Sequence, residues 1–519
     1  MNNNLTRNTN STISDSDIRL SGFNKNLYLE EITDKTEDLK KKRLRYGIKN
    51  IVGLLFQKME FSVLSSINYL AVYYAAYCSF KDKSIKMENS ITLSSILTFS
   101  QFSTIWFGGV LKEYIHMKII LIIGGAFLIL GSIGIMFLET LIGYKFMMVV
   151  YGIGIGIQET ISNANASAFI PEKKGLINGL ANISWTLACS FFNFIGLHII
   201  NPDKKDVVFY DDINGISDNI IKYTIITIFC FLGFTTVATI LIYPYKKEDY
   251  EVKLELDSNQ ENIEDNDADN NKSEKLDDDN KNNGEEKVKI IKKIDDDNNN
   301  EQIIEIDEDN ISFLEYLKCV RLYTCLLMCS FKNIHNNLIT SSFILFSNHY
   351  DTVSVNTQQY ISSSSFIVNL IVTAILSLFI DKFKYRSIVI PSNILVFFHA
   401  LTFQFVKKNQ ILFIIYFFLS GIFISIENLA TFPHLLKVFG NRYIVVIFGI
   451  FCIGTGLCDL AMNAFVDHIL SRYNEDQKDE YDKAVNGLFY ITASFTLISV
   501  ILMSFESEYS VLYWKWKCK

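Results

Sequence analysis

Six ionisable side chains lie inside long apolar stretches of this 519-residue chain, where the surrounding sequence offers them little water. A charge at bilayer depth costs at least about 2.5 to 3.5 kcal/mol, so such a residue usually faces a partner or a water-filled cavity. Amino, carboxyl and imidazole groups placed there can bind a charged solute or carry a proton. The pattern predicts a pathway for a solute or proton, and its candidates are Lys58, Glu60, Glu159, Lys332, His335 and Glu427.

The position of each basic candidate limits its role. Lys332 lies at the centre of its apolar stretch, too deep for its ammonium group to reach the membrane surface, and is the simplest partner for a substrate carboxylate. His335, one turn further, could titrate near physiological pH, but a lone helical His is more often only hydrogen-bonded. Lys58 and Glu60 are intramembrane if their helix starts at 51 and interfacial if it starts near 60. Two residues apart, they cannot share a helix face.

Two carboxylates have an amide neighbour that extends the candidate site. Glu159 follows Gln158, and Glu427 precedes Asn428. We expect these residues to bind substrate or a proton, and the alternative for Glu159 is a structural clamp near a cytoplasmic gate. Burial away from water favours the neutral form of a carboxyl group, which suits a proton carrier.

The sequence lacks the motifs of other chemistries. It holds no phosphate-binding Gly-Lys-Ser/Thr loop, no nucleophile elbow and no paired His/Cys metal spacing. Gly152, Gly154 and Gly156 superficially resemble a dinucleotide loop, but no strand precedes them and close helix packing explains them better. We therefore expect no catalytic residues, no cofactor, no metal and no nucleic-acid partner, and we do not expect an enzyme.

Twelve apolar stretches bounded by charges predict an all-α integral membrane protein with twelve transmembrane helices, because about twenty apolar residues span a bilayer. Stretches this frequent could not all be buried in one soluble core. The expected spans are 51–77, 91–111, 118–139, 141–169, 174–200, 220–244, 318–347, 358–380, 387–407, 410–432, 442–468 and 484–504.

The acidic character of the chain belongs to one segment. Residues 251–310 hold 22 Asp and Glu, 8 Lys and no Arg, so this segment carries −14 and the rest of the chain +6, which gives the overall −8. Its few large apolar residues cannot offset chain entropy. We expect a disordered N-terminal tail (1–47), a six-helix bundle (48–244), a disordered acidic connector (245–317), a second six-helix bundle (318–504) and a C-terminal tail (505–519).

Lys and Arg indicate the orientation. With twelve spans both termini lie on the same side, and that side holds 18 Lys and Arg within 40–49, 112–118, 173–174, 382–386, 437–442 and 515–519, against about 12 on the other. Cytoplasmic loops carry the excess of basic residues. We therefore expect a multi-pass protein of the plasma membrane or an organelle membrane, with both termini in the cytoplasm.

An internal repeat divides the spans into two halves. Residues 152–159 in the fourth span have a counterpart at 421–428 in the tenth, 269 residues later. The loop 109–118 matches the loop 377–386 at an offset of 268. An even number of spans per repeat gives two parallel six-helix repeats, as expected of a transporter whose halves rock about a central site.

The second of these loops carries a recognisable pattern. Residues 377–386, with Asp381, Lys382 and Arg386 at fixed spacing, resemble the signature loop of the major facilitator superfamily, and the first-half copy, which includes Glu113, is degenerate. The resemblance implies the major facilitator fold, with helices 1, 4, 7 and 10 lining a central cavity. It also implies that Glu113, Asp381, Lys382 and Arg386 are gate charges that hold the cytoplasmic ends together.

Within that superfamily, residues 171–179 are similar to a stretch of the oxalate:formate antiporter and monocarboxylate transporter group, as is the region of Pro433 and the glycines that follow it to 456. Oxalate-type members carry an Arg and a Lys where this chain has Thr373 and Thr455. Because both cationic partners of a dicarboxylate are absent, the resemblance does not extend to a dicarboxylate substrate.

These features favour a secondary active transporter with alternating access, working by symport or antiport on a small organic solute. A monocarboxylate or related metabolite is the first hypothesis, with Lys332 meeting its negative end and a proton carried among Glu60, Glu159 and Glu427. An amino-acid or other zwitterion facilitator on the same fold is an alternative. A transporter-like receptor or scaffold, whose connector is the working part, is an alternative of another class.

Overall fold

The computed structural model describes residues 15–80, 82–83, 85, 89–138, 140–203, 215–246, 249, 313–350, 353, 355–380, 382–440, 442–470 and 477–505. The chain divides into two units, Met1–Ile48 with Tyr245–Gly284, and Lys49–Pro244 with Glu285–Lys519. The second unit contains the helical bundle and the candidate site.

All regular elements within the described ranges are helices. They are α1 (Asp15–Ser79), α2 (Asn89–Tyr114), α3 (Met117–Phe137), α4 (Leu141–Phe169), the short η1 (Pro171–Lys173), α5 (Lys174–Ile200), α6 (Ile216–Leu241), α8 (Phe313–Leu317), α9 (Val320–His349), α10 (Val355–Ser377), α11 (Tyr385–Val406), α12 (Gln410–Phe439), α13 (Ile444–Leu470) and α14 (Lys478–Phe505).

Twelve of these helices are long, and each overlaps one of the twelve expected spans. Eight of them, counted within the described residues, are long and apolar enough to cross a membrane: α3, α4, α5, α6, α11, α12, α13 and α14. The other four, α1, α2, α9 and α10, carry polar residues into the interior, among them Lys58, Lys332 and Asn369. The predicted all-α fold class is confirmed, and the helix count is consistent with twelve spans.

The N-terminal tail differs from its expected disorder. Helix α1 begins at Asp15 and runs without interruption to Ser79. No proline lies between these residues, and Glu37 and Lys41, one turn apart, form an ion pair of 3.7 Å that favours a helix. Composition predicted disorder because the tail is polar, but a polar helix can continue outward from an apolar one. Most of the acidic connector and the C-terminal tail lie outside the described residues.

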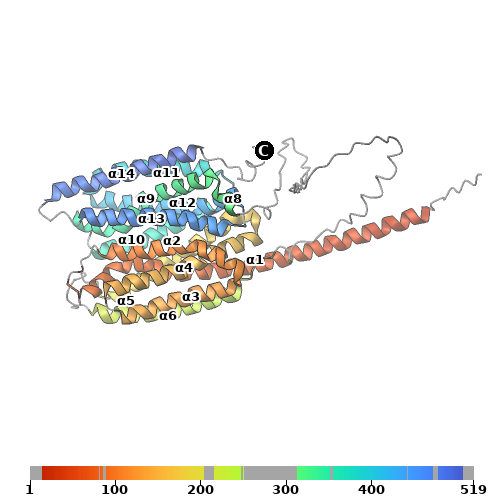
Figure 1. Ribbon diagram of the computed structural model, residues 1–519, viewed down its shortest axis with the longest axis horizontal. Coiled ribbons are helices and arrows are strands. Elements are labelled where there is room, and N and C mark those ends of the chain that lie inside the picture. Colours follow the sequence, from red (N-terminus) through yellow and green to blue (C-terminus); the bar gives the residue numbers. More distant parts are fainter. Residues whose placement is uncertain are drawn as a thin grey trace, which may run out of the picture. The chain divides into compact units, whose positions relative to one another are not determined.

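The two halves repeat one helical plan. Helices α3, α4 and α5 begin 268, 269 and 270 residues before α11, α12 and α13, within one residue of the offsets of 268 and 269 that the sequence repeat shows. In Figure 1 the orange and yellow helices of the first half lie beside the green and blue helices of the second, with α2 and α13 adjacent at the boundary. Helices α5 and α10 form a second contact between the halves, and α5 also contacts α12.

Glycines let the helices of the two halves approach closely. A Cβ added at Gly449 of α13 would lie 2.3 Å from the backbone nitrogen of Trp106 in α2. A Cβ added at Gly179 of α5 would lie 2.2 Å from the Cβ of Ser377 in α10. Both distances are too short for any side chain larger than hydrogen, so these glycines set the separation of the halves.

Apolar side chains cover the outside of the bundle. Large hydrophobic residues of α3, α6, α11 and α14 are exposed, among them Phe137, Phe229, Phe405 and Phe505. A soluble protein rarely exposes so much apolar surface, whereas lipid chains cover it without cost. These four helices therefore contribute to the lipid-facing surface.

Replacing Gly449 with Ala should lower the thermal melting temperature of the detergent-purified protein, because α13 must move away from the backbone of α2. Overpacking of this kind costs about 1 to 3 kcal/mol. Gly233 of α6 is the matched control, since a Cβ there meets nothing within 4 Å. Gly233→Ala should leave the melting temperature unchanged or raise it slightly, and an equal loss in both variants would contradict the close-packing argument.

Candidate functional site

Two adjoining cavities, of about 280 and 230 Å³, lie between the two halves. We call the larger one the ionic chamber, since Lys58, Glu159 and Glu427 line it, and the smaller one the amide chamber, since five Asn line it. The chambers adjoin each other, since they share six lining residues: Phe102, Asn182, Trp185, Asn333, Asn428 and Thr455. Helices α1, α4, α9 and α12, which the superfamily resemblance implied, all contribute to the walls.

The tightest ion pair of the site belongs to the second half. The Lys332 Nζ of α9 lies 2.7 Å from Glu427 Oε1 of α12 and also donates to Thr431 Oγ1 at 2.8 Å. Glu427 and Thr431 share a helix face because they are four residues apart, and both line the ionic chamber. Lys332 is only 1% exposed and does not itself line either chamber, so it is connected to the cavity through Glu427 and Thr431.

A second, looser pair belongs to the first half. The Lys58 Nζ of α1 lies 3.5 Å from Glu159 Oε1 of α4, and Gln101 of α2 donates to the other carboxylate oxygen, Oε2, at 2.8 Å. The side chains of Lys58 and Glu159 are 10% and 22% exposed, and all three residues line the ionic chamber. Lys58 is therefore the cation that directly faces the cavity.

The two pairs occupy corresponding places in the repeat. Each half places its Lys on its first helix and its Glu on its fourth, with offsets of 274 between the lysines and 268 between the glutamates. The sequence repeat paired Glu159 with Glu427 or Asn428, but it did not pair Lys58 with Lys332. The cavity wall, together with Lys332 directly behind it, thus holds two lysines and two glutamates, and these four charges sum to zero.

Two amide candidates have different surroundings. Asn428 lines both chambers. Gln158 is buried between α4 and α1, where Gln57 Nε2 donates to its backbone oxygen at 3.0 Å, and it is not a lining residue. Asn178 of the first half donates to the backbone oxygen of Asn428 at 3.2 Å, so this residue also joins the halves.

Glu60 faces the interior of the first half rather than the cavity. It is fully buried, and Thr235 of α6 donates to its Oε1 at 2.7 Å. Neither chamber includes it, whereas Lys58 two residues earlier lines one. The structure therefore places these two residues on different faces of α1, as their spacing predicts.

His335 lies inside the second half. Its Nε2 lies 2.9 Å from His399 Nδ1 of α11, and its Nδ1 lies 3.1 Å from Thr492 Oγ1 of α14. His399 Nε2 in turn lies 2.9 Å from the backbone oxygen of Tyr416 in α12. This chain of polar contacts ties four helices of one half together and does not line either chamber.

The four expected gate charges are not brought together in the described residues. Glu113 and Lys382 are exposed, and Asp381 lies outside the described residues. Arg386 donates to the backbone oxygens of Met503, at 3.3 Å, and Ser504. These carbonyls belong to the last turn of α14, where a cation stabilises the helix end, so Arg386 joins α11 to α14 within one half.

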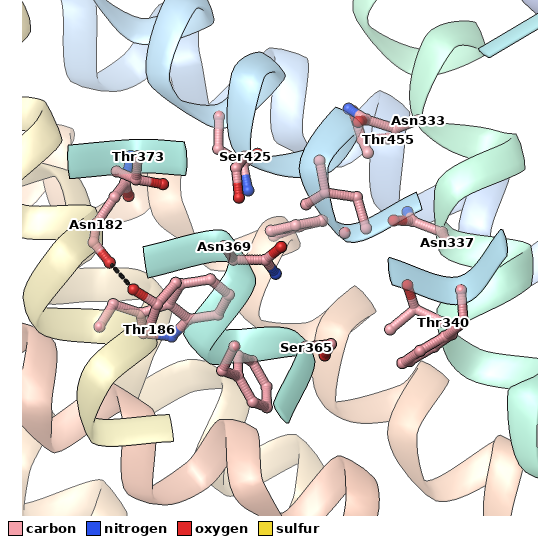
Figure 2. A pocket seen from close by; sticks show the side chains of 17 residues that line it. Asn182, Thr186, Asn333, Asn337, Thr340, Ser365, Asn369, Thr373, Ser425 and Thr455 are labelled. Carbon is pink, nitrogen blue, oxygen red and sulfur yellow. Dashed lines mark hydrogen bonds between the residues drawn. The ribbon is translucent and has the colours of Figure 1, made fainter. Parts of the chain in front are cut away.

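Sequence reasoning missed most of the uncharged polar wall and one buried acid. Asp459 of α13 is 7% exposed and hydrogen-bonds to Asn463 at 3.3 Å, and Asn463 reaches Ser95 of the other half at 2.8 Å. Figure 2 shows the wall of the amide chamber, with Asn333 and Asn337 on α9 and Asn369 on α10. Amides inside apolar stretches were the signal that could have indicated this wall, although an uncharged amide stands out less there than a charge does.

Breaking the ion pair of Lys332 and Glu427 should destabilise the protein more than breaking the pair of Lys58 and Glu159. Lys332→Gln alone leaves Glu427 buried without its cation, which costs about 3 to 5 kcal/mol, and the double variant Lys332→Gln with Glu427→Gln should recover most of that loss. The corresponding cycle at Lys58 and Glu159 should give a coupling energy of about 1 kcal/mol or less, because that pair is longer and more exposed. Unfolding in detergent measures both cycles, and equal coupling energies would contradict the difference in tightness.

Comparisons with known proteins agree with this architecture. Residues 34–193 match the family model of the Major Facilitator Superfamily. The structure is similar to the crystal structure of the human organic anion transporter MFSD10 (TETRAN), with a TM-score of 0.58 and 9% identity, covering 89% of this chain and 99% of that chain. It is also similar to the proton:xylose symporter XylE bound to 6-bromo-6-deoxy-D-glucose, with a TM-score of 0.57 and 11% identity, covering 89% of this chain and 95% of that chain.

No curated protein matches the sequence. The matches do not support the finer resemblance to the monocarboxylate and oxalate:formate group, which stays a prediction. They show that the chain shares its fold with two membrane transporters. The chain has the major facilitator fold, which supports a secondary transporter of small molecules.

Proposed function

We propose that this protein is a proton-coupled secondary transporter of a small organic anion, most simply a monocarboxylate. The observation that carries the proposal is the neutral set of charges in and behind the cavity wall, two Lys and two Glu arranged as two pairs. An entering anion can bind one of the lysines only after that lysine separates from the glutamate of its ion pair. A proton on that glutamate provides the release, because a neutral carboxyl group no longer holds the ammonium.

The first-half pair is the better place for this exchange. Lys58 and Glu159 line the ionic chamber, and their 3.5 Å separation is long for an ion pair. Gln101 can keep a hydrogen bond to Glu159 while Lys58 turns to the substrate. Lys332 remains the second candidate cation, since it must first separate from Glu427 at 2.7 Å.

One proton would therefore enter with each anion, so that the charge of the cavity stays unchanged during the cycle. A charge without a partner at this depth would be costly, and the paired entry avoids that cost. The proposed transport is electroneutral symport, and in reverse the same scheme describes efflux of the anion with its proton.

Uptake of labelled monocarboxylates into proteoliposomes should increase when the outside is made more acidic than the inside. Glu159→Gln should uncouple the protein, because Lys58 is then free at every pH. Exchange of the anion across the membrane should persist in this variant while the response to the pH gradient is lost. If the uptake rate of the unaltered protein does not change with the pH gradient, proton coupling is contradicted.

The lysines need a separate test in the same vesicles. Lys58→Gln should reduce anion uptake at least about tenfold, since the loss of a charge-assisted hydrogen bond costs about 1.5 to 3 kcal/mol. Lys332→Ala should reduce uptake further, with a loss of thermal stability that Lys58→Gln does not show. Unchanged rate and affinity in both variants would contradict the anion assignment.

A zwitterion facilitator is a second candidate, and one observation favours it. Lys58 and Glu159 both face the ionic chamber, so an amino acid could insert its carboxylate and ammonium groups between them without any proton. Competition between amino acids and monocarboxylates distinguishes the two candidates. The receptor or scaffold alternative is tested by deleting 251–310, since retained transport would argue against it.

A further inference from the structure

The amide chamber differs sharply in chemistry from the ionic chamber beside it. Its 17 lining residues include no Asp, Glu, Lys, Arg or His. Eleven of them are uncharged polar residues: Asn182, Asn333, Asn337, Asn369, Asn428, Thr186, Thr340, Thr373, Thr455, Ser365 and Ser425. A charged group in this chamber would lose its water without meeting a counter-charge, so the chamber suits a neutral group.

Hydrogen-bonding capacity is left over in the cavity wall. Asn182, which lines both chambers, has a buried side-chain nitrogen without a partner among the described residues. Thr160 and Asn163 line the ionic chamber and are 3% and 6% exposed. Each has a buried side-chain oxygen that has no hydrogen-bond partner among the described residues. Buried polar atoms in proteins are normally satisfied, so a polar ligand that reaches these donors and acceptors would supply the missing bonds.

Aromatic side chains provide the remaining surface. Phe102 and Trp185 border both chambers, and Phe366 meets Trp185 edge to face at a centroid distance of 6.4 Å. Figure 2 shows the labelled amides and hydroxyls of α5, α9, α10 and α12 arranged around the chamber. A wall of amides and hydroxyls with flat apolar rings fits a group that has several hydroxyls or amides and an apolar face.

We propose that the substrate has two ends, a carboxylate held in the ionic chamber and a neutral body, bearing hydroxyl or amide groups, held in the amide chamber. This inference rests on the proposed anion function and specifies its substrate class. Short aliphatic monocarboxylates would use only the first chamber. A dicarboxylate would place its second charge among Thr373, Thr455 and the amides, where no cation lines the wall.

The test compares three probes of equal carbon number: gluconate, hexanoate and sorbitol. Gluconate has the carboxylate and the hydroxyls, hexanoate only the carboxylate, and sorbitol only the hydroxyls. In proteoliposomes carrying the full chain, gluconate should bind about 5- to 30-fold more tightly than hexanoate, because one to two hydrogen bonds contribute about 1 to 2 kcal/mol. Sorbitol should compete weakly, since it leaves the ionic chamber empty.

Asn182→Leu should abolish most of the advantage of gluconate, and it should weaken gluconate binding more than hexanoate binding, because Asn182 lines both chambers. Two adjacent serines of α10 give a matched pair, because Ser365 lines the amide chamber and Ser364 is exposed outside it. Ser365→Ala should weaken gluconate binding by a few fold, and Ser364→Ala should not. Thermal melting of each variant in detergent shows that it is folded, and the serine pair keeps the test open if Asn182→Leu is unstable.

The possible failures are distinguishable. If hexanoate binds as tightly as gluconate, the two-ended substrate is wrong while the anion function stands. If Asn182→Leu weakens both anions equally, the amide chamber does not hold the neutral body. If sorbitol competes as well as gluconate, the carboxylate has no role, and both the anion function and the two-ended substrate are overturned.

Discussion

The need to neutralise a charge that has left water governs the interior of this protein. An ammonium group in the core of a membrane protein requires a carboxylate at close range and further hydrogen bonds. Lys332 has both, since Glu427 lies at 2.7 Å and Thr431 at 2.8 Å, one turn apart on α12. This requirement fixes α9 against α12. Lys58 has the same requirement, and its ion pair with Glu159 joins α1 to α4. Gln101 also donates to Glu159, which brings α2 into the same cluster.

Each ion pair lies within one half of the molecule, so motion of one half against the other does not need to break either pair. The contacts between halves are of another kind. They are glycine contacts, such as Gly449 against the backbone at Trp106, and neutral hydrogen bonds, such as Asn463 to Ser95 at 2.8 Å and Asn193 to Ser363 at 2.6 Å. A neutral hydrogen bond contributes about 1 kcal/mol and can be exchanged for water when a cavity opens. Rigid halves with exchangeable contacts between them suit the rocking motion expected of this fold.

Much of the fold could be predicted from the sequence because the bilayer imposes a length on each apolar stretch. The expected bounds of 141–169 and 174–200 coincide with α4 and α5. The helix over the N-terminal tail was not predicted, because composition describes the average solubility of a segment and not its local hydrogen bonding. Charges in apolar stretches identified the two glutamates of the cavity, since a charge is rare at such positions.

The sequence did not show which residue each ionisable side chain contacts, or whether the side chain points into the cavity or into its own half. Lys332 and Glu427 are far apart in the chain, and only the packing of α9 against α12 brings them together. Glu60 and His335 are likewise ionisable residues in apolar stretches, yet both turn into their own half. Asn in an apolar stretch is less costly than a charge and therefore more common, so the amide wall gave only a weak signal.

The two ion pairs differ in tightness, and this difference determines which lysine an entering anion would bind. If both pairs were equally tight, an entering anion would have no preferred cation and would compete with two carboxylates at once. The longer separation at Lys58, 3.5 Å against 2.7 Å at Lys332, makes the first-half pair easier to open. The amide chamber lies mostly against α9, α10 and α12 of the second half. A substrate with its charged end at Lys58 and its neutral body at the amides would therefore bridge the halves, and closure around it would depend on both of its ends.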